Sequence, residues 1–304
     1  MRLGEAYRRT NRHEEAATEY RAAIDLDPLN AEARGGLAKV LRLQGKIDEA
    51  EALHKEQINL RPKDWQGYLD YGIFLEQAGT RLEEAAAVFE KAVELAPDNP
   101  LIRRNLGLIH MRLGRQDEAR AELQKAIEIR PSAGAFDALG GIEFFSGRYE
   151  QARLAYEEAV RLQPNNAVRW GNLADAQRFT PGYETQALES YRKAIELAEL
   201  RVAIGDGNHR QVRNLALYHA KSGDVAAGRR TFDSLPDAVR DTAASHYAAA
   251  TMHEIAGNRS RAIDSLRRAL ETGYPVSQIA SDPEFASLRA NAEGARLMSE
   301  FASP

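Results

Sequence analysis

Residues 100–131 read PLIRRNLGLIHMRLGRQDEARAELQKAIEIRP, and this stretch contains the pattern that decides the fold. Pro100 suits the first turn of a helix, where no backbone N–H is needed. Pro131 follows a run of apolar and charged residues, where it would end a second helix. Gly114 lies between the two runs and suits a tight turn. The stretch therefore predicts two helices joined by a short turn.

The same pattern recurs along the chain with a period close to 34 residues. Prolines at the corresponding place are 34, 35, 34 and 33 residues apart, namely Pro28, Pro62, Pro97, Pro131 and Pro164. A fixed period of this length is the signature of stacked repeats. Chain length alone would instead predict about two domains of ~150 residues. We rely on the repeat period rather than on the chain length to predict the domain organisation.

Small and large residues recur at fixed places within each period. The fourth unit contains Leu106, Gly107, His110, Ala119, Leu123 and Ala126, and the fifth contains Leu139, Gly140, Ala152, Tyr156 and Ala159. This order resembles the tetratricopeptide repeat, a 34-residue unit of two antiparallel helices, A and B. The resemblance implies an all-α fold, a right-handed superhelical solenoid whose A helices line the concave side.

We expect eight repeats followed by a C-terminal helical cap that solvates the last repeat. The repeats are placed at approximately 1–30, 31–63, 64–98, 99–131, 132–164, 165–207, 208–236 and 237–273, and the cap at 274–304. The sixth is seven residues too long, which predicts an extended B helix from Ala187 to roughly Ile204 and a turn at 205–208. The first begins inside its A helix. Either the chain is a piece of something longer, or this N-terminal face meets another protein or a second copy.

Side chains at the predicted helix ends and crossings agree with this arrangement. Helix starts are expected after Asn30, Asp64, Asn99 and Asn166, because their side-chain oxygens can accept a free backbone N–H. Glycine in helix A, as at Gly107, removes bulk where helix B crosses it.

Composition excludes several classes of protein. The 304 residues contain no cysteine, so there is no disulfide framework and no thiolate nucleophile or ligand. With 45 acidic and 41 basic side chains, the net charge is -4, which provides no basic footprint for nucleic acid or an anionic membrane. No uncharged apolar window reaches the length of a membrane span. We therefore expect a cytoplasmic protein without nucleic-acid or membrane partners.

No stretch carries a catalytic or cofactor signature. Residues 205–207 form a lone GxG with no preceding strand, which we interpret as a turn between repeats. His219, His246 and His253 lie late in the chain and invite a metal hypothesis. However, His219 and His253 fall where the repeat usually packs a tyrosine, so packing is the better interpretation. We expect no enzyme, no cofactor and no metal.

The resemblance also implies where a ligand would bind, because A-helix positions 2, 5, 6, 9, 12 and 13 do not pack internally. Arginine and asparagine there can bind the carboxylates and backbone of an extended peptide, and aromatic side chains can anchor it. The alternative is that these charges solubilise the concave face and that Phe144 packs on a neighbouring helix. The candidate groove residues are Arg104, Asn105, Met111, Arg112, Asp137, Phe144, Phe145, Asn172, Asp175, Arg178, Arg210, Arg213 and Asn214.

These patterns favour a noncatalytic scaffold or adaptor that binds a peptide or protein segment in the concave groove. The residue set with which chaperone-binding relatives hold a C-terminal carboxylate is incomplete here, so that ligand is not expected. From about residue 165 the chain, including Asp282-Pro283-Glu284-Phe285, resembles repeat arrays attached to bacterial signalling proteins. The alternative is therefore a sensor or regulatory module of such a protein, with its kinase or DNA-binding part absent from this chain.

Overall fold

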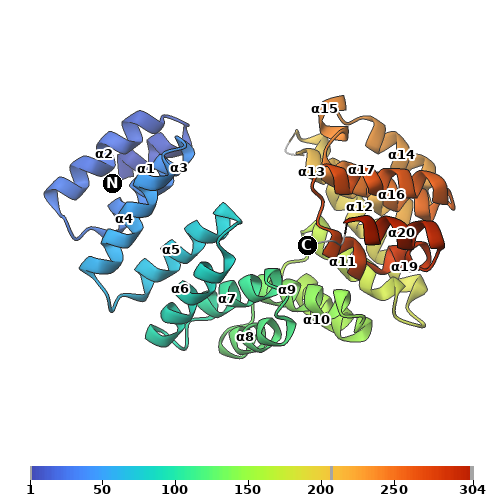
Figure 1. Ribbon diagram of the computed structural model, residues 1–304, viewed down its shortest axis with the longest axis horizontal. Coiled ribbons are helices and arrows are strands. Elements are labelled where there is room, and N and C mark those ends of the chain that lie inside the picture. Colours follow the sequence, from blue (N-terminus) through green and yellow to red (C-terminus); the bar gives the residue numbers. More distant parts are fainter. Residues whose placement is uncertain (1, 206–207, 302–304) are drawn as a thin grey trace. The chain divides into compact units, whose positions relative to one another are not determined.

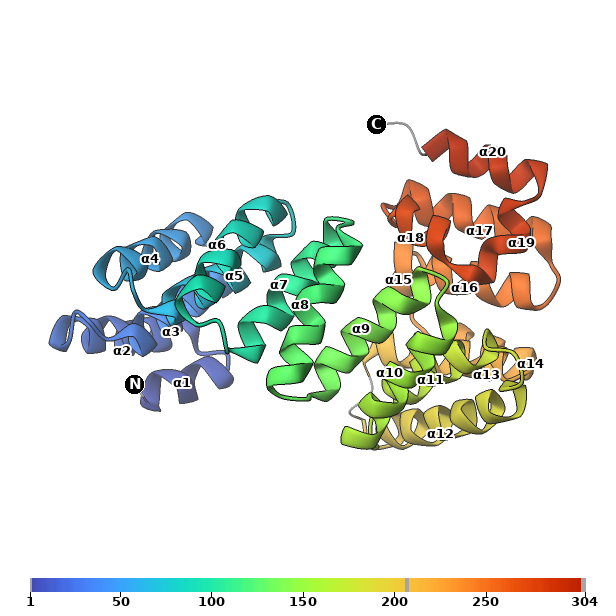
Figure 2. The same ribbon diagram turned by 90° about the horizontal axis from the view of Figure 1, so that it is seen from below.

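The computed structural model describes residues 2–205 and 208–301, and the described secondary structure is entirely helical (Figures 1 and 2). The all-α prediction is confirmed. Contacts divide the chain into two units, residues 1–131 and 132–304. The division falls at the expected boundary between the fourth and fifth repeats.

Four helix pairs make up the first unit. In each pair the first helix is the A helix and the second is the B helix. The pairs are α1 (Arg2–Arg9) with α2 (His13–Leu26), α3 (Ala31–Leu43) with α4 (Ile47–Leu60), α5 (Trp65–Ala78) with α6 (Leu82–Leu95), and α7 (Pro100–Arg112) with α8 (Gln116–Ile129).

The second unit has four further pairs and a C-terminal segment. The pairs are α9 (Ala133–Phe145) with α10 (Tyr149–Leu162), α11 (Ala167–Arg178) with α12 (Glu184–Ala203), α13 (His209–Lys221) with α14 (Val225–Asp233), and α16 (Ala243–Ile255) with α17 (Arg259–Glu271). The short α15 (Asp237–Arg240) joins the last two pairs. The C-terminal segment contains α18 (Val276–Ser281), the 3-10 turn η1 (Pro283–Phe285), α19 (Ala286–Arg289) and α20 (Ala292–Phe301).

The helix starts follow the predicted capping residues. Asn30, Asp64, Asn99 and Asn166 each precede an A helix, and each side chain accepts a backbone N–H from the first turn. These bonds satisfy donors that a helix start otherwise leaves without a partner. Gly114 has a φ of 76°, a left-handed conformation that other residues adopt at a cost, and it makes the turn between α7 and α8.

Close helix crossings explain the glycines of the A helices. A Cβ atom built on Gly72 would lie 2.6 Å from the ring of Phe89 in the partner helix α6. One built on Gly107 would lie 2.8 Å from Leu123 and 3.1 Å from the backbone oxygen of Ala119. In these two pairs the B helix presses a large side chain onto the backbone of its A helix, as the repeat pattern predicts.

The sixth pair shows the predicted extension of its B helix. Helix α12 has 20 residues, whereas the B helices of the first five pairs have 14 each. Part of the predicted turn after it, Asp206 and Gly207, lies outside the described residues.

The C-terminal segment does more than solvate the last repeat. Ile279, Phe285, Leu288 and Leu297 are fully buried and pack with Leu266 of α17. Figure 2 shows α18 and α19 against α16 and α17. The apolar residues of this segment thus extend the core of the last helix pair.

None of the described helices is long and apolar enough to cross a lipid bilayer.

Candidate functional site

The A-helix face of the second unit contains a buried ion pair with the chain's own C-terminal segment. Arg178, the last residue of α11, donates two hydrogen bonds to Glu284 of η1, with Nη1–Oε1 and Nη2–Oε2 distances of 2.6 and 2.8 Å. Only 6% of the Glu284 side chain is exposed. This fork-to-fork geometry is the strongest form of an arginine–carboxylate contact.

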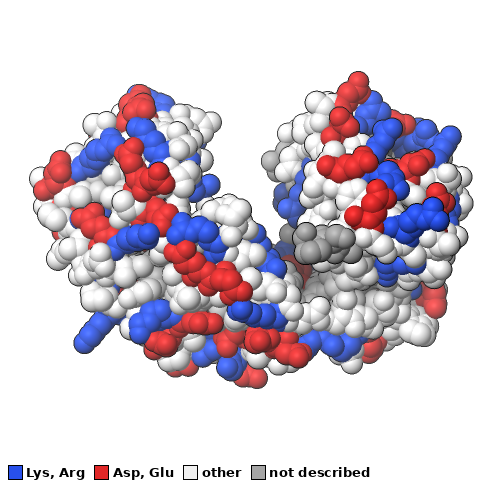
Figure 3. All heavy atoms as spheres, in the orientation of Figure 1, with Lys and Arg blue, Asp and Glu red and all other residues white. Residues whose placement is uncertain are grey.

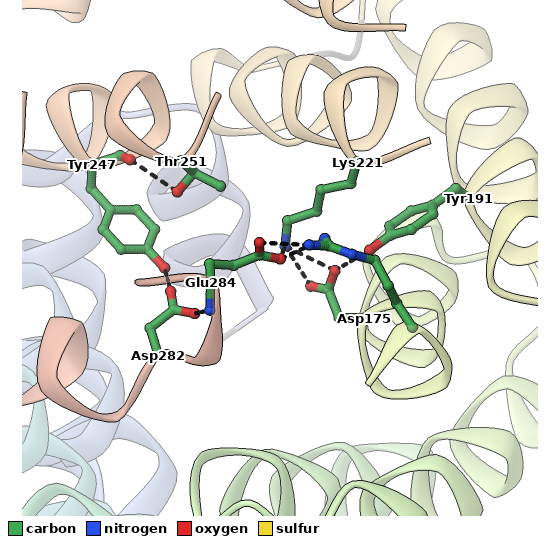
Figure 4. A network of polar contacts seen from close by, with 8 residues as sticks. Asp175, Tyr191, Lys221, Tyr247, Thr251, Asp282 and Glu284 are labelled. Atoms are coloured by element: carbon green, nitrogen blue, oxygen red, sulfur yellow. Dashed lines mark hydrogen bonds and ion pairs between the residues drawn. The ribbon is translucent and has the colours of Figure 1, made fainter. Parts of the chain in front are cut away.

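A lysine and a second carboxylate complete this ion network (Figure 4). Lys221, the last residue of α13, lies 2.8 Å from Asp175 of α11 and 3.6 Å from Glu284. Tyr191 of α12 donates its hydroxyl hydrogen bond to Asp175. Burial acts to lower the pKa of Lys221, but Asp175 and Glu284 outweigh it and the net shift is upward. Burial likewise acts to raise the pKa of Glu284, but Lys221 and Arg178 outweigh it and lower that pKa.

A second set of contacts holds the same segment next to α16. Tyr247 of α16 donates a hydrogen bond to the Asp282 carboxylate, which also accepts the backbone N–H of Glu284 at 2.9 Å. Arg289 donates to the backbone oxygen of Ile279 at 2.7 Å. Figure 4 shows Asp282 directed at Tyr247 and Glu284 directed at Lys221. The chain's own residues 282–285 therefore occupy this part of the A-helix face.

The predicted groove residues of the second unit fall into three groups. Asp175 and Arg178 belong to the ion network, and Asp137 pairs with Arg169 at 2.8 Å. Phe144 is buried and packs edge-on against Tyr149 and Phe179, as the alternative expectation held. The third group remains partly or largely accessible and comprises Phe145, Asn172, Arg210, Arg213 and Asn214.

In the third group, Arg213 has no salt-bridge partner among the described residues. Burial, followed by the charge of Arg210, lowers its pKa. Asn214 lines a small hollow of about 100 Å³ together with Asn166 and Tyr218.

The first unit has a hollow on its A-helix face between α3 and α5. Its volume is about 230 Å³, and no segment of the described chain fills it. Lys39 and Arg42 of α3 contribute cations that form no salt bridge with any other described residue. His54 of α4 is buried, with 4% of its surface exposed. The lining residues are Arg8, Ala38, Lys39, Arg42, Leu43, His54, Asp70, Ile73, Phe74 and Gln77.

Two titratable groups in this hollow have shifted pKa values. Burial, followed by the nearby charge of Lys39, lowers the pKa of His54 to about 4, so the imidazole is neutral at neutral pH. Burial raises the pKa of Asp70, although Lys39 opposes the shift. Cations, a neutral imidazole and apolar side chains therefore meet in one concave place.

The other predicted residues of the first unit lie on α7. Arg104 donates to the side chain of Asn105 at 3.2 Å, and Asn105 is buried. Arg112 donates to the backbone oxygen of Glu76 at 3.1 Å, whereas Met111 is 38% exposed. None of these four residues lines the hollow between α3 and α5.

Sequence reasoning missed His54 and Glu284. His54 lies on a B helix, so a scan of A-helix positions did not reach it. Glu284 lies in the C-terminal segment, where two acidic residues flank a proline and precede a phenylalanine. Nothing in that local pattern predicts contact with α11.

The late histidines do not converge in the described structure. His246 lies 3.1 Å from Asp241, and burial lowers the pKa of His253. Among the described residues, no three histidine, aspartate or glutamate side chains are grouped so that they could hold a metal ion. Figure 3 shows cations and anions interspersed over the visible faces of both units.

Comparison with known families agrees with the helix pairs. Models of the tetratricopeptide repeat match residues 1–56, 50–100, 75–134, 133–166 and 213–277. The chain belongs to the tetratricopeptide repeat family. Members of this family act as protein-interaction scaffolds.

Curated relatives match this chain over a minor part of their own length. Human "Protein O-mannosyl-transferase TMTC1" is 31% identical over 58% of this chain and 20% of its own length. "Small glutamine-rich tetratricopeptide repeat-containing protein 2" of Mycosarcoma maydis is 32% identical over 39% of this chain and 31% of its own. "Hsp70-Hsp90 organizing protein" of Triticum aestivum is 33% identical over 32% of this chain and 17% of its own length. The chain thus spans less than a third of the length of each of these relatives.

Solved structures share the tetratricopeptide repeat fold. A tetratricopeptide repeat protein from Parabacteroides merdae aligns over 93% of this chain and 99% of its own, with a TM-score of 0.58 and 14% identity. The "APC/C hetero-tetramer Cut9-Hcn1" aligns over 96% of this chain and 53% of that chain, with a TM-score of 0.59 and 15% identity. At such identities the likeness concerns the fold alone.

Proposed function

We propose that this chain is a noncatalytic interaction scaffold that binds a peptide or protein segment on the A-helix face of its repeats. The family supports this role, because its members act as protein-interaction scaffolds. The name of one relative, "Hsp70-Hsp90 organizing protein", describes a protein that organises other proteins.

The hollow between α3 and α5 carries the proposal. It is concave, it combines Lys39 and Arg42 with the apolar side chains of Ile73 and Phe74, and the described chain does not fill it. Such a combination of apolar wall and few polar groups is what ligand sites share. In the second unit, residues 282–285 already occupy the corresponding face.

Each unit also has accessible residues among those that the sequence predicted, and we propose them as further contact positions within that unit. In the first unit these are Arg104, Met111 and Arg112 on α7. In the second unit they are Phe145, Asn172, Arg210, Arg213 and Asn214, which are not members of the ion network of Arg178. Arginine and asparagine suit an extended segment because they can bind both its carboxylates and its backbone.

A displayed library of random 12-residue peptides, panned on the full chain, tests this proposal. Selected peptides should bind the unmodified chain, and the double variant Lys39→Glu/Arg42→Glu should lose them. The matched control is Arg21→Glu/Lys63→Glu, which makes the same charge change at two exposed residues outside the hollow. Peptides that bind both double variants equally well, or a panning without enrichment, would contradict the proposed site.

A further inference from the structure

The ion network of the second unit and the hollow of the first lie at equivalent places in the repeat. Arg178 is the twelfth residue of α11, and Arg42 is the twelfth residue of α3. Asp175 and Lys39 are the ninth residues of the same two helices. In the second unit the arginine already holds a carboxylate.

Neighbouring helices supply equivalent residues as well. Tyr191 is the eighth residue of the B helix α12, and His54 is the eighth residue of the B helix α4. Lys221 is the thirteenth residue of the following A helix α13, and Gln77 is the thirteenth of α5. The two sites therefore occupy equivalent positions in their repeats. In the second unit, residues of the chain itself fill the site.

The first unit's version has polar groups without partners. Arg42 and Lys39 line the hollow and form no salt bridge within the described chain. His54 lines it too, is at least nine-tenths buried, and its Nδ1 atom has no hydrogen-bond partner among the described residues. Its ring lies 5.2 Å from that of Phe74 and 6.1 Å from that of Tyr71, so it is held in place. A buried polar atom without a partner is costly, and a ligand that supplies the partner would remove this cost.

We infer that the hollow of the first unit binds an acidic segment of a partner protein. A carboxylate of that segment would pair with Arg42 in the way that Glu284 pairs with Arg178. This inference rests on the proposed function and names the class of partner for the same site. The bound segment would run over α3 and α5.

Charge at the hollow favours a carboxylate over an amine. Arg8, Lys39 and Arg42 line it, and Asp70 is its acidic group. Arg8 is already paired with Glu5 at 2.7 Å. Lys39 stands where the second unit has the anion Asp175, and Gln77 stands where it has the cation Lys221. The first A helix of the hollow therefore provides two cations and no anion there. An incoming carboxylate would compensate these cations, whereas an amine would add to them.

The apolar part of the lining suits the neighbours of that carboxylate. Leu43, Ile73 and Phe74 line the same hollow. In the second unit, Phe285 directly follows Glu284 and is fully buried. An acidic segment with an adjacent aromatic or aliphatic side chain therefore matches the chemistry that the protein already uses in its own chain.

The test uses a labelled peptide with the sequence IASDPEFASLRA, which is that of residues 279–290. Its control has asparagine and glutamine in place of the two carboxylates, which keeps shape and removes charge. Fluorescence anisotropy with the full chain should show the acidic peptide binding about tenfold more tightly, since charge-assisted hydrogen bonds are roughly twice as strong as neutral ones. Raising the salt concentration should reduce this difference.

Variants of the chain and a crosslinking peptide locate the site. Arg42→Gln should weaken binding of the acidic peptide at least about fivefold, and the exposed Arg21→Gln should leave it unchanged. A photoreactive benzoylphenylalanine in place of the peptide's phenylalanine should crosslink to α3 or α5. Crosslinks to α11 or α13 would mean that the peptide displaces residues 282–285, and would overturn the inference.

Three further outcomes separate this inference from the proposed function. Equal affinity for the acidic and amide peptides, or no binding of either, overturns the acidic-segment inference. Panned peptides that lack acidic residues and still require Lys39 and Arg42 would preserve the proposed function alone. Failure of the panning itself would instead contradict the proposed function.

Discussion

Replacing Glu284 by alanine should destabilise the second unit far more than replacing Glu300. Both glutamates tie the C-terminal segment to the repeats through two short arginine contacts. Glu284 reaches Arg178 at 2.6 and 2.8 Å, and Glu300 reaches Arg267 at 2.7 and 2.8 Å. The pairs differ in burial, because Glu284 is 6% exposed and Glu300 is 49% exposed.

The expected magnitudes follow from this difference in exposure. Removing one partner of a buried ion pair costs about 3–5 kcal/mol, because the other charge stays buried without compensation. Here Arg178 is 31% exposed and can regain some water, and Lys221 keeps Asp175 at 2.8 Å. We therefore expect Glu284→Ala to cost about 2–3 kcal/mol, slightly below that range. Glu300→Ala should cost less than about 1 kcal/mol, as exposed pairs do.

The chain offers a local reporter for this measurement. It has two tryptophans, and a Trp65→Phe background leaves only Trp170, which lies on α11 of the second unit. Urea unfolding in that background, followed by tryptophan fluorescence, gives the free energy of unfolding of the region that contains Arg178. A double variant, Arg178→Met with Glu284→Ala, should recover part of the loss because no buried charge is left uncompensated.

Equal effects of the two alanine variants would refute this reasoning. So would a cost below about 1 kcal/mol for Glu284→Ala, because the network would then behave as a solvated surface pair. In either case residues 282–285 would not be held on the A-helix face by Glu284.

Three further predictions concern the first unit. Because burial lowers the pKa of His54 to about 4, the unfolded chain binds a proton at this imidazole more readily than the folded chain does. This difference should lower the free energy of unfolding by about 2 kcal/mol from pH 7 to pH 5. Urea midpoints of His54→Gln should lack this contribution, and an unchanged dependence of its stability on pH would contradict the prediction. Gly72→Ala should cost about 1–3 kcal/mol, since its Cβ would lie 2.6 Å from Phe89; Phe89→Leu in the same chain should restore part of the melting temperature, and failure to do so would argue against the clash. Asn99→Ala should cost about 1 kcal/mol in thermal unfolding, because Asn99 caps α7 at 3.0 Å, and Asn99→Asp should cost much less; similar losses in both would rule out the cap.

The helix pairs could be predicted from the sequence because local rules specify them. A proline follows the end of a B helix, as at Pro131, and an asparagine or aspartate precedes an A helix, as at Asn99. A glycine in the left-handed region joins an A helix to its B helix, as at Gly114. The seven extra residues of the sixth repeat could be assigned to α12 for the same reason. Each of these residues affects the backbone only within a few positions of itself.

The candidate site could be predicted only in part. A-helix positions singled out Asp175 and Arg178 as groove residues, but they could not show that Glu284, 106 positions away from Arg178, contacts it. His54 escaped because it reaches the A-helix face from a B helix. Phe144 occupies a groove position and is nevertheless buried by Tyr149 and Phe179.

The sequence by itself determined the repeat, the helix ends and the close crossings, since these depend on backbone geometry and residue size. The tertiary structure alone decided which part of the A-helix face the chain fills and which it leaves accessible. That outcome depends on the path of the segment after α17. Burial of Phe285, Leu288 and Leu297 on the last helix pair sets this path and brings Glu284 to Arg178. The first unit has no such segment among its described contacts, so Lys39 and Arg42 remain without a salt-bridge partner.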